Sequence, residues 1–600
     1  MNLYGQQKDS ARWSAEFNFE SGTNYQKKDA IGWAFSNGGG FINGKVSRKT
    51  DKLQITLGLG YSDYFRLTSR RGVTYNRPDI VTDKDSYIVN LDLTHTENDN
   101  ERLNGNLDIL WNIDRNNKMG ASYRHEIAND TPMSSTLSSA EPFISHEEIY
   151  SIIDNWEEIT GGIDYTYLYN EGFNSRNTGT FQAYWDHRFE KLNRDLRISA
   201  EWSPYSNNEY TKWTKGAGNT DFFDDFTEDV VWRTTPRYKS NNLKGLVKYT
   251  DYALGGNKNL RMDLSLDALL KTNDDLYTAA NLINGEWVDS TRYRESFKYT
   301  SLKLQPTVRL QWHCGKFFLN AGVTPEYYSD KLENHIYSQS FDEGTVSAIF
   351  DITGTYTLSE KGSVSAYINR NVNHPGYLNL CWFPRPGSYS REIIRGNPKL
   401  KPTKSLRAGL TYQLQYDNFS SRFELGTNYE SDRIERTFST ELIDDDEYRV
   451  YSWVNAGWSL TSFAKASAAY STGKLKAELN GTVNYFISSN INNERFRNAD
   501  YNISGNVNYD FAKGWSAMLN AKYQSKIIRT YNSMTEYIGC NIRVSKSFGK
   551  KFRFKVYFEI RDLFDKNIRT EIISEDRCYS RLEDMDYNRR MGCLGINFSF

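Results

Sequence analysis

Hydrophobic and polar residues alternate with a period of two along much of the chain. The clearest run has apolar side chains at every second position: Leu53, Ile55, Leu57, Leu59 and Tyr61. The same alternation recurs at 260–267, 302–312 and 542–560. Successive side chains of a β-strand point to opposite faces, so each run predicts a strand with one apolar and one polar face. Pro306 cannot donate to the ladder, so it predicts either a bulge or an error in that strand.

The end of the chain carries the same pattern. Its apolar face consists of Leu594, Ile596, Phe598 and Phe600, and the chain stops on that last aromatic ring. A soluble sheet rarely ends on a bare aromatic residue at the edge of an apolar face. The last strand of a transmembrane β-barrel closes against the first and leaves no edge. The C-terminus therefore favours a barrel.

Tight turns punctuate the alternating runs. Ten are predicted, at residues 49–52, 114–117, 190–194, 255–258, 313–316, 359–362, 416–420, 471–474, 511–515 and 547–551. With one strand before the first hairpin (12–20) and one after the last (590–600), they predict about 22 antiparallel strands. Longer polar stretches lie between the hairpins, at 66–103, 129–175, 203–240, 272–296, 371–403, 431–448 and 563–586. Short periplasmic turns and long extracellular loops are typical of outer-membrane barrels.

Composition fits this prediction. Only 38% of residues are hydrophobic, the mean hydropathy is -0.70, and no run of 18 apolar residues predicts a transmembrane helix. A barrel wall reconciles these values with a membrane, because its lumen face is polar. Aromatic residues make up 15% of the chain, which suits two interfacial girdles. The same composition also fits a soluble all-β protein, such as a propeller or a carbohydrate-binding protein.

The sequence offers little chemistry. A net charge of -1 gives no reason to expect a nucleic-acid partner. Five cysteines without C-x-x-C spacing predict neither a metal site nor a disulfide framework, although a bridge between Cys381 and Cys578 stays open. We read the acidic runs 221–229 and 444–447 as solvated loops in preference to calcium sites. Catalytic motifs are missing, so we expect no enzyme and no cofactor.

Candidate ligand-binding residues cluster in one predicted outer loop: Trp382, Arg385, Tyr389, Arg391 and Arg395. Aromatic faces stack on sugars or flat chelates, and guanidinium groups bind carboxylates or phosphates. The alternative is that these side chains pack the loop or belong to the outer girdle. Trp213, Trp232, Trp287 and Tyr293 are similar candidates in other loops.

Three segments resemble a known family. Residues 395–402 (Arg-Gly-Asn-Pro-Lys-Leu-Lys-Pro) resemble the G-N-P-x-L-K-P motif of TonB-dependent outer-membrane receptors. Residues 374–380 resemble the R-P-x-Y-x-x-L stretch that precedes it, with His374 in place of arginine, and 562–567 resemble the late D-L-F-[ND]-x-N motif. We expect a structural role for the motif residues, in which prolines stiffen the loop and Gly and Asn permit turns. They are Pro375, Tyr377, Gly396, Asn397, Pro398, Leu400, Lys401, Pro402 and Phe600.

The resemblance covers the chain and implies an outer-membrane transport barrel. It implies contact with outer-membrane lipid, insertion by the barrel assembly machinery through the C-terminal strand, and uptake of a scarce or bulky metal chelate, oligosaccharide or peptide. Family members carry a plug domain and a segment that contacts a TonB-type energy coupler before the barrel. We expect residues 1–600 to form one barrel domain without plug or signal peptide. A plugless passive pore and a soluble all-β extracellular binding protein remain the alternatives.

Overall fold

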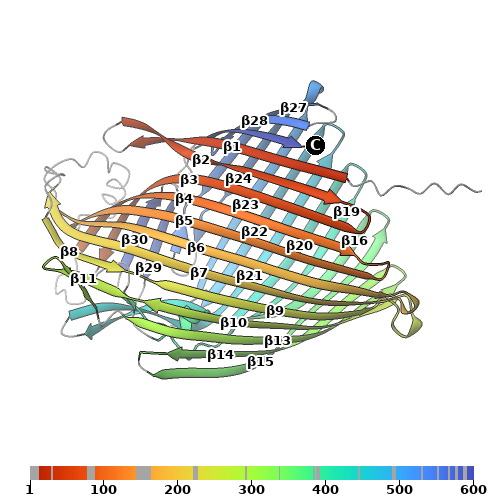
Figure 1. The fold of residues 1–600 in the computed structure, drawn as a ribbon, viewed down its shortest axis with the longest axis horizontal. Helices are drawn as coiled ribbons and strands as arrows, with labels where there is room; N and C mark the ends of the chain where they lie inside the picture. The colour runs from red at the N-terminus through yellow and green to blue at the C-terminus, as the bar shows by residue number, and fades with distance from the viewer. Residues whose placement is uncertain are drawn as a thin grey trace, which may run out of the picture.

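The strands of the chain form one continuous sheet that closes on itself (Figure 1). The computed structural model describes residues 12–28, 32–76, 88–142, 164–219, 227–290, 294–336, 338–382, 385–386, 392–443, 446–489, 495–528, 532–549, 553–564, 568–574, 579–585 and 591–599. Within these ranges, no helix is long and apolar enough to span a membrane.

Twenty-two long strands form the wall of the barrel. In chain order they are β1 (Arg12–Lys28), β2 (Gly32–Lys49), β3 (Leu53–Asn76), β4 (Ile88–Asn112), β5 (Asn117–Pro142), β6 (Asp164–Phe189), β7 (Arg194–Asn219), β9 (Arg237–Asp251), β10 (Leu260–Tyr277), β13 (Glu295–Cys314), β14 (Phe317–Asn334), β15 (Gln339–Ser359), β16 (Gly362–Asn373), β19 (Thr403–Gln415), β20 (Phe419–Ile443), β21 (Asp446–Ser471), β22 (Leu475–Ser489), β23 (Arg495–Asp510), β24 (Trp515–Gln524), β27 (Tyr537–Phe548), β28 (Arg553–Arg561) and β31 (Met591–Ser599).

Shorter elements lie in the connections. The strands are β8 (Thr227–Thr234), β11 (Ala279–Ile283), β12 (Glu286–Asp289), β17 (Arg385–Pro386), β18 (Glu392–Ile394), β25 (Ile527–Ile528), β26 (Asn532–Met534), β29 (Ile568–Ser574) and β30 (Tyr579–Met585). The helical turns are η2 (Glu190–Leu192), η4 (Leu254–Gly256), α2 (Tyr377–Leu380) and η5 (Ala512–Gly514).

The first and last strands of the wall pair with each other. β1 and β31 run antiparallel, from Glu16 opposite Ser599 to Asn24 opposite Met591. Inside the barrel, the Asn597 side chain donates a hydrogen bond to that of Asn18. Closure satisfies the backbone groups that an open sheet edge would leave bare in lipid. The prediction of a closed antiparallel barrel of about 22 strands is confirmed.

The ten predicted turns all join consecutive wall strands. At the turn between β4 and β5, the Asp114 carboxylate accepts hydrogen bonds from the backbone N–H groups of Asn116 (2.7 Å) and Asn117 (2.8 Å). Such Asx contacts fix a tight turn locally, which explains why turn residues could be recognised in the sequence.

The predicted outer loops are too long. Strands β5, β6, β7 and β21 each contain 26 residues, whereas a membrane needs about 9–11 per strand. The polar stretch 66–103 is largely strand, because β3 continues to Asn76 and β4 begins at Ile88. Outside the membrane both faces of a strand meet water, so the apolar alternation disappears while the pairing continues.

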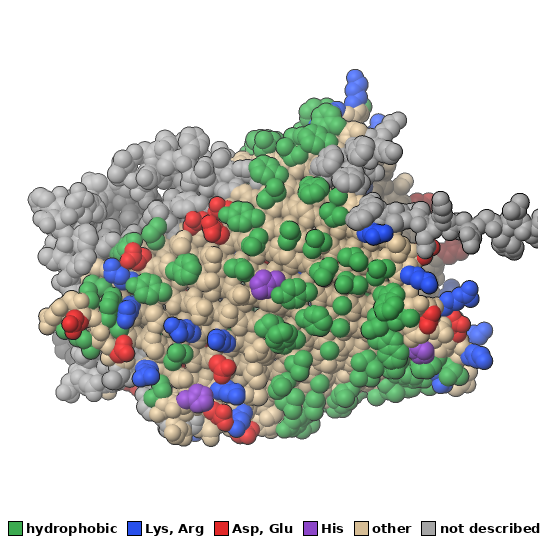
Figure 2. All heavy atoms as spheres, in the orientation of Figure 1, with side chains coloured by type: hydrophobic (Ala, Val, Ile, Leu, Met, Phe, Trp, Pro, Cys, Tyr) green, Lys and Arg blue, Asp and Glu red, His purple; other side chains and the backbone are tan. Residues whose placement is uncertain are grey.

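Apolar side chains point outward over a limited band of the wall. On β3, Leu57 and Leu59 are 51% and 62% exposed, whereas Thr56, which directly precedes Leu57, is 4% exposed. On β23, the outward-facing Tyr501 and Tyr509 bound the band at its two ends. Figure 2 shows hydrophobic side chains gathered over the half of the wall nearest the tight turns. Apolar side chains are thus exposed on the outer face and polar side chains are buried on the inner face, as a lipid-facing surface requires.

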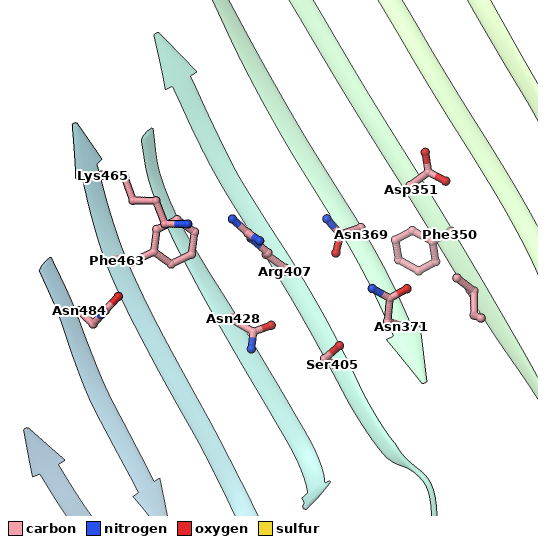
Figure 3. A pocket seen from close by; sticks show the side chains of 11 residues that line it. Phe350, Asp351, Asn369, Asn371, Ser405, Arg407, Asn428, Phe463, Lys465 and Asn484 are labelled. Carbon is pink, nitrogen blue, oxygen red and sulfur yellow. The ribbon is translucent and has the colours of Figure 1, made fainter. Parts of the chain in front are cut away.

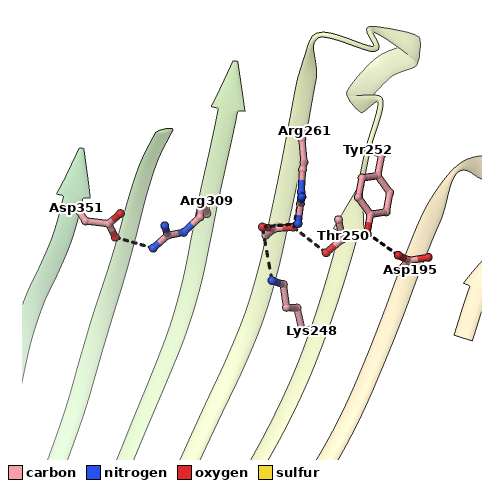
Figure 4. A network of polar contacts seen from close by, with 8 residues as sticks. Asp195, Lys248, Thr250, Tyr252, Arg261, Arg309 and Asp351 are labelled. Atoms are coloured by element: carbon pink, nitrogen blue, oxygen red, sulfur yellow. Dashed lines mark hydrogen bonds and ion pairs between the residues drawn. The ribbon is translucent and has the colours of Figure 1, made fainter. Parts of the chain in front are cut away.

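The inner face is polar and connected by ion pairs. On β10, Asp263 accepts hydrogen bonds from Thr250 (2.7 Å) and Arg261 (3.1 Å), and Lys248 lies 3.7 Å away (Figure 4). Arg309 of β13 reaches across Gly322 of β14 and donates to Asp351 of β15 at 2.7 Å. Charged groups therefore face the lumen, where water and neighbouring charges stabilise them.

Pro306 lies within a continuous strand. β13 runs through it, and Pro306 still faces Leu266 of β10. Pairing with β14 stops at Leu304–Tyr327 and resumes at Val308–Val323, with no residue gained on either side. The strand assignment was therefore correct, but the strand has no bulge. Instead the pairing opens locally where Pro306 lies opposite Pro325, because neither proline can donate a backbone hydrogen bond.

The facing of side chains can be tested on β10. Leu266 points outward near the middle of the apolar band, and its neighbour Ser265 points into the lumen. Leu266→Arg should destabilise the barrel by about 2–4 kcal/mol in lipid vesicles, because it places a charge in hydrocarbon. Ser265→Arg should change the free energy of unfolding far less. Equal losses for the two variants in a refolding titration would refute the assignment.

Candidate functional site

Residues 374–402 connect β16 to β19, and the described parts of this connection (374–382, 385–386 and 392–402) fold back onto the barrel. Its first part packs against the inner face of β9, β13 and β14. Its second part reaches the opposite way, where β18 pairs in parallel with β21 from Glu392–Arg449 to Ile394–Tyr451. The two described parts of the connection therefore contact strands as far apart as β9 and β21, and we call residues 374–402 the inner strap.

Aromatic rings hold the first part of the inner strap. The Tyr377 ring lies 5.6 Å from that of Tyr299, 5.7 Å from Phe297 and 5.9 Å from Tyr238. Phe297, Tyr299, Leu332 and Cys381 form a buried cluster against which Tyr377 and Trp382 pack. Removing such rings from water stabilises the docked strap, and their mutual packing fixes its position.

Buried carboxylates add directional contacts to the same part. His374 stacks on Tyr328 with ring centroids 3.6 Å apart, and its Nε2 lies 2.7 Å from Glu326 Oε1. The Cys381 thiol donates to Glu295 Oε1 at 2.6 Å, and both side chains are buried. Cys578, its suggested disulfide partner, lies outside the described residues.

Tyr299 links the aromatic cluster to a buried acid. Its hydroxyl donates to Asp330 and lies 3.0 Å from the Tyr328 hydroxyl. Burial raises the pKa of Tyr299, and the nearby Asp330 charge raises it further. The phenol therefore remains neutral and stays a hydrogen-bond donor at physiological pH.

The G-N-P-x-L-K-P segment anchors the second part of the strap. Asn397 donates its amide to the Trp453 carbonyl at 3.0 Å, and its backbone N–H donates to Asn379 O at 2.6 Å. The Lys401 backbone exchanges two 2.8 Å hydrogen bonds with the Asn455 side chain. Of the remaining motif residues, Pro375, Gly396 and Leu400 are buried, Pro398 and Pro402 are half-buried, and Phe600 lies outside the described residues.

Only two of the five ligand candidates have described side chains. Trp382 is half-buried beside the aromatic cluster. Arg395 makes a two-pronged contact with Glu441, with both nitrogen–oxygen distances 3.2 Å. The Arg385 backbone lies in β17, and Tyr389 and Arg391 lie outside the described residues. Among the other aromatic candidates, Trp213 stacks on Trp232 at 5.7 Å and Arg233 lies 4.6 Å above Trp287.

The inner wall also carries a hollow that sequence reasoning missed. It has a volume of about 600 Å³ and lies over β15, β16 and β19–β22 (Figure 3). Amide groups from Asn369, Asn371, Asn428 and Asn484 line it, together with Arg407, Lys465 and Phe463. Arg407 donates to Glu424 at 2.9 Å and lies 4.9 Å from the Phe463 ring centroid. The only sequence signal was their position on the polar face of alternating strands.

The polar groups of the site suit binding better than catalysis. Among the described residues, no group of three or more His, Cys, Asp and Glu side chains could hold a metal ion. The acidic runs singled out in the sequence lie partly outside the described residues. Amides, cations and aromatic rings facing a lumen can bind a hydrated or anionic solute through hydrogen bonds and charge.

A substitution at Gly396 tests the contact between the two parts of the inner strap. A Cβ atom there would collide with the backbone of Cys381, so Gly396→Ala should push the two parts of the strap apart. Overpacking costs about 1–3 kcal/mol, which corresponds to an increase of roughly 5- to 150-fold in local opening. Limited trypsin cleavage after Arg391, which is followed by Glu392, should accelerate accordingly. Gly376→Ala, where a Cβ meets open space, is the control, and equal cleavage rates for both variants would contradict the contact.

Solved structures with this architecture are outer-membrane receptors and transporters. The siderophore receptor PiuA from Acinetobacter baumannii matches with a TM-score of 0.62 and 10% identity, over 98% of this chain and 82% of that one. The copper transporter OprC matches at 0.60 and 10%, over 99% and 84%. The ferric citrate transporter FecA matches at 0.56 and 8%, over 98% and 78%. At 8–10% identity, these structural matches show a shared fold alone.

The sequence itself identifies the family. No curated protein matches the chain. A model of the outer membrane protein beta-barrel family matches residues 187–600, most of the barrel wall. The match and the fold place the protein in the outer membrane and overturn the soluble alternative. The chain belongs to the outer membrane protein beta-barrel family and has the fold of TonB-dependent receptors.

Proposed function

We propose that this chain is the transport barrel of a receptor that takes up a scarce or bulky ligand. The observation that carries the proposal is the lumen. A closed wall of 22 strands encloses a space too wide for its own side chains to fill. The inner wall presents amides, hydroxyls and charges, so a hydrated solute can move along it without meeting an apolar barrier.

A lumen this wide needs a gate. Natural 22-stranded transporters hold a plug, so we infer a plug domain inside the barrel as a partner. Movement of the plug requires energy from the inner membrane, and we infer a TonB-type coupler at the periplasmic side. Outer-membrane lipid surrounds the apolar band, and the barrel assembly machinery inserts the chain through β31. No catalytic step belongs to this proposal.

Metal chelates are the ligand class that we favour. The similar structures include a siderophore receptor, a copper transporter and a ferric citrate transporter. Chelates rich in carboxylate oxygens suit guanidinium and ammonium groups, and their flat faces suit aromatic rings. We assign capture to Trp382, Arg385, Tyr389, Arg391 and Arg395 in the strap, and onward passage to Arg407 and Lys465. Oligosaccharides and peptides are the other ligand classes.

Energy dependence tests the proposal. Uptake of radiolabelled ferric citrate, a ferric siderophore and copper would be measured in whole cells. Isolated outer-membrane vesicles, which lack an inner membrane, would be the control. Uptake of the cognate chelate should fall to background, by about tenfold or more, when an uncoupler removes the inner-membrane proton gradient. Uptake that survives the uncoupler and rises linearly with ligand concentration would support a passive pore instead.

Loop variants make the same assay specific. Arg395→Ala should reduce uptake several-fold without unfolding the barrel, because the half-exposed Arg395–Glu441 pair contributes only about 0.2–1 kcal/mol. Trp382→Ala should also reduce uptake several-fold, and because Trp382 packs against the buried aromatic cluster, heat-modifiable gel mobility would check that this variant folds. Lys399→Ala, an exposed change in the same strap, is the matched control. If Trp382→Ala and Arg395→Ala both transport like the Lys399→Ala control, the assignment of capture to this strap fails.

A further inference from the structure

The outer face of the wall has an opening between β6 and β7. Their pairing stops at Thr178–Tyr205 and resumes at Phe181–Trp202. Pro204 lies in the gap and cannot donate a backbone hydrogen bond, and Gly179 faces it without a side chain. A Cβ on Gly179 would lie 3.2 Å from the Pro204 ring. The opening therefore depends on this Gly–Pro combination.

The opening widens into a hollow of about 330 Å³. Tyr123, Phe181 and Trp202 line one end and are all outward-facing and substantially exposed. The other end is polar and is lined by His125, Asn177, Asn241 and Lys239. Through the opening the hollow also reaches Tyr205, whose ring contacts Tyr238 beneath the inner strap. The hollow thus has an apolar half and a polar half.

The hollow lies at the level of the wall where the hydrocarbon core of the membrane ends. Trp202 lies eight residues along β7 from its start at Arg194, and Lys239 lies twelve residues from the end of β9 at Asp251. A transmembrane strand takes about 9–11 residues, so the aromatic half lies within the hydrocarbon and the polar half just outside it. The hollow is continuous with the lipid-facing band, part of which is visible in Figure 2.

Its polar groups suit a phosphate-bearing head group. The Tyr123 hydroxyl lies 3.1 Å from His125 Nδ1, which leaves Nε2 as the ring nitrogen available to a ligand. Lys239 is exposed and supplies a positive charge beside two amide side chains. Ammonium, imidazole and amide N–H groups donate hydrogen bonds, and phosphate oxygens accept them. Acyl chains would cover the exposed Phe181 and Trp202 rings.

We propose that this hollow is a binding site for one membrane lipid with a phosphate head group. The lipid's chains lie along Phe181 and Trp202, and its phosphate lies over Lys239 and Asn241. The bound lipid fills the opening that Pro204 leaves between β6 and β7 and covers wall atoms that lateral pairing does not protect. The lipid occupies the outer face of the wall, so its binding does not involve the strap residues to which we assign ligand capture.

Native mass spectrometry tests the site directly. The 600-residue protein, purified in a non-ionic detergent, would be mixed with dioleoyl phosphatidylglycerol or with dioleoylglycerol, which has the same chains but no phosphate. One phosphatidylglycerol should remain bound per barrel at lipid concentrations at which dioleoylglycerol is lost. Equal retention of the two lipids would overturn the assignment of a phosphate head group.

Variants locate the binding. Gly179→Leu fills the hollow and should reduce retention of phosphatidylglycerol at least tenfold, whereas Gly481→Leu, an outward-facing glycine of β22 with open space around it, should not. Lys239→Ala changes only an exposed side chain and should weaken retention even if Gly179→Leu fails to fold. Heat-modifiable gel mobility reports folding of each variant. The proposal fails if Lys239→Ala and a folded Gly179→Leu both retain phosphatidylglycerol like the unchanged protein.

Discussion

The pairing of β1 with β31 is the constraint on which the rest of the structure depends. An open sheet of this length would leave two rows of backbone N–H and C=O groups in hydrocarbon, each at a cost of several kcal/mol. Closure from Glu16–Ser599 to Asn24–Met591 removes both rows at once. Once the ring is closed, every strand must send alternate side chains to lipid and to lumen, and the polar composition of the chain follows.

The sequence predicted what is decided locally or by the membrane. The ten turns could be located because their contacts lie within a few residues, as at Asp114, and the apolar band could be read because lipid demands an unbroken row such as Leu53 to Tyr61. The outer ends of the strands could not be predicted, because outside the membrane neither face of a strand is apolar. The opening opposite Pro325 depends on which prolines meet across strands, which local pattern does not reveal.

The inner strap could be recognised but its position could not be predicted. The sequence predicted a loop at residues 371–403 with stiff, turn-forming residues, and Gly396 and Asn397 do anchor the strap within it. Its partners Glu326, Glu295 and Tyr299 lie on strands distant in sequence, so no local signal connected them. Polar residues on the inner face thus serve two purposes, since some hold the strap and others, such as Lys465, line an open hollow.

A cross-link between the first and last strands tests the closed barrel most directly. Asn18 and Asn597 face each other across the β1–β31 seam and are joined by a side-chain hydrogen bond. In protein folded into lipid vesicles, Asn18→Cys with Asn597→Cys should form a disulfide within one chain under mild oxidation, as read by peptide mass mapping. Asn18→Cys paired with Asn480→Cys, on the distant strand β22, should not. Failure of the first pair to cross-link, or cross-links only between chains, would contradict closure.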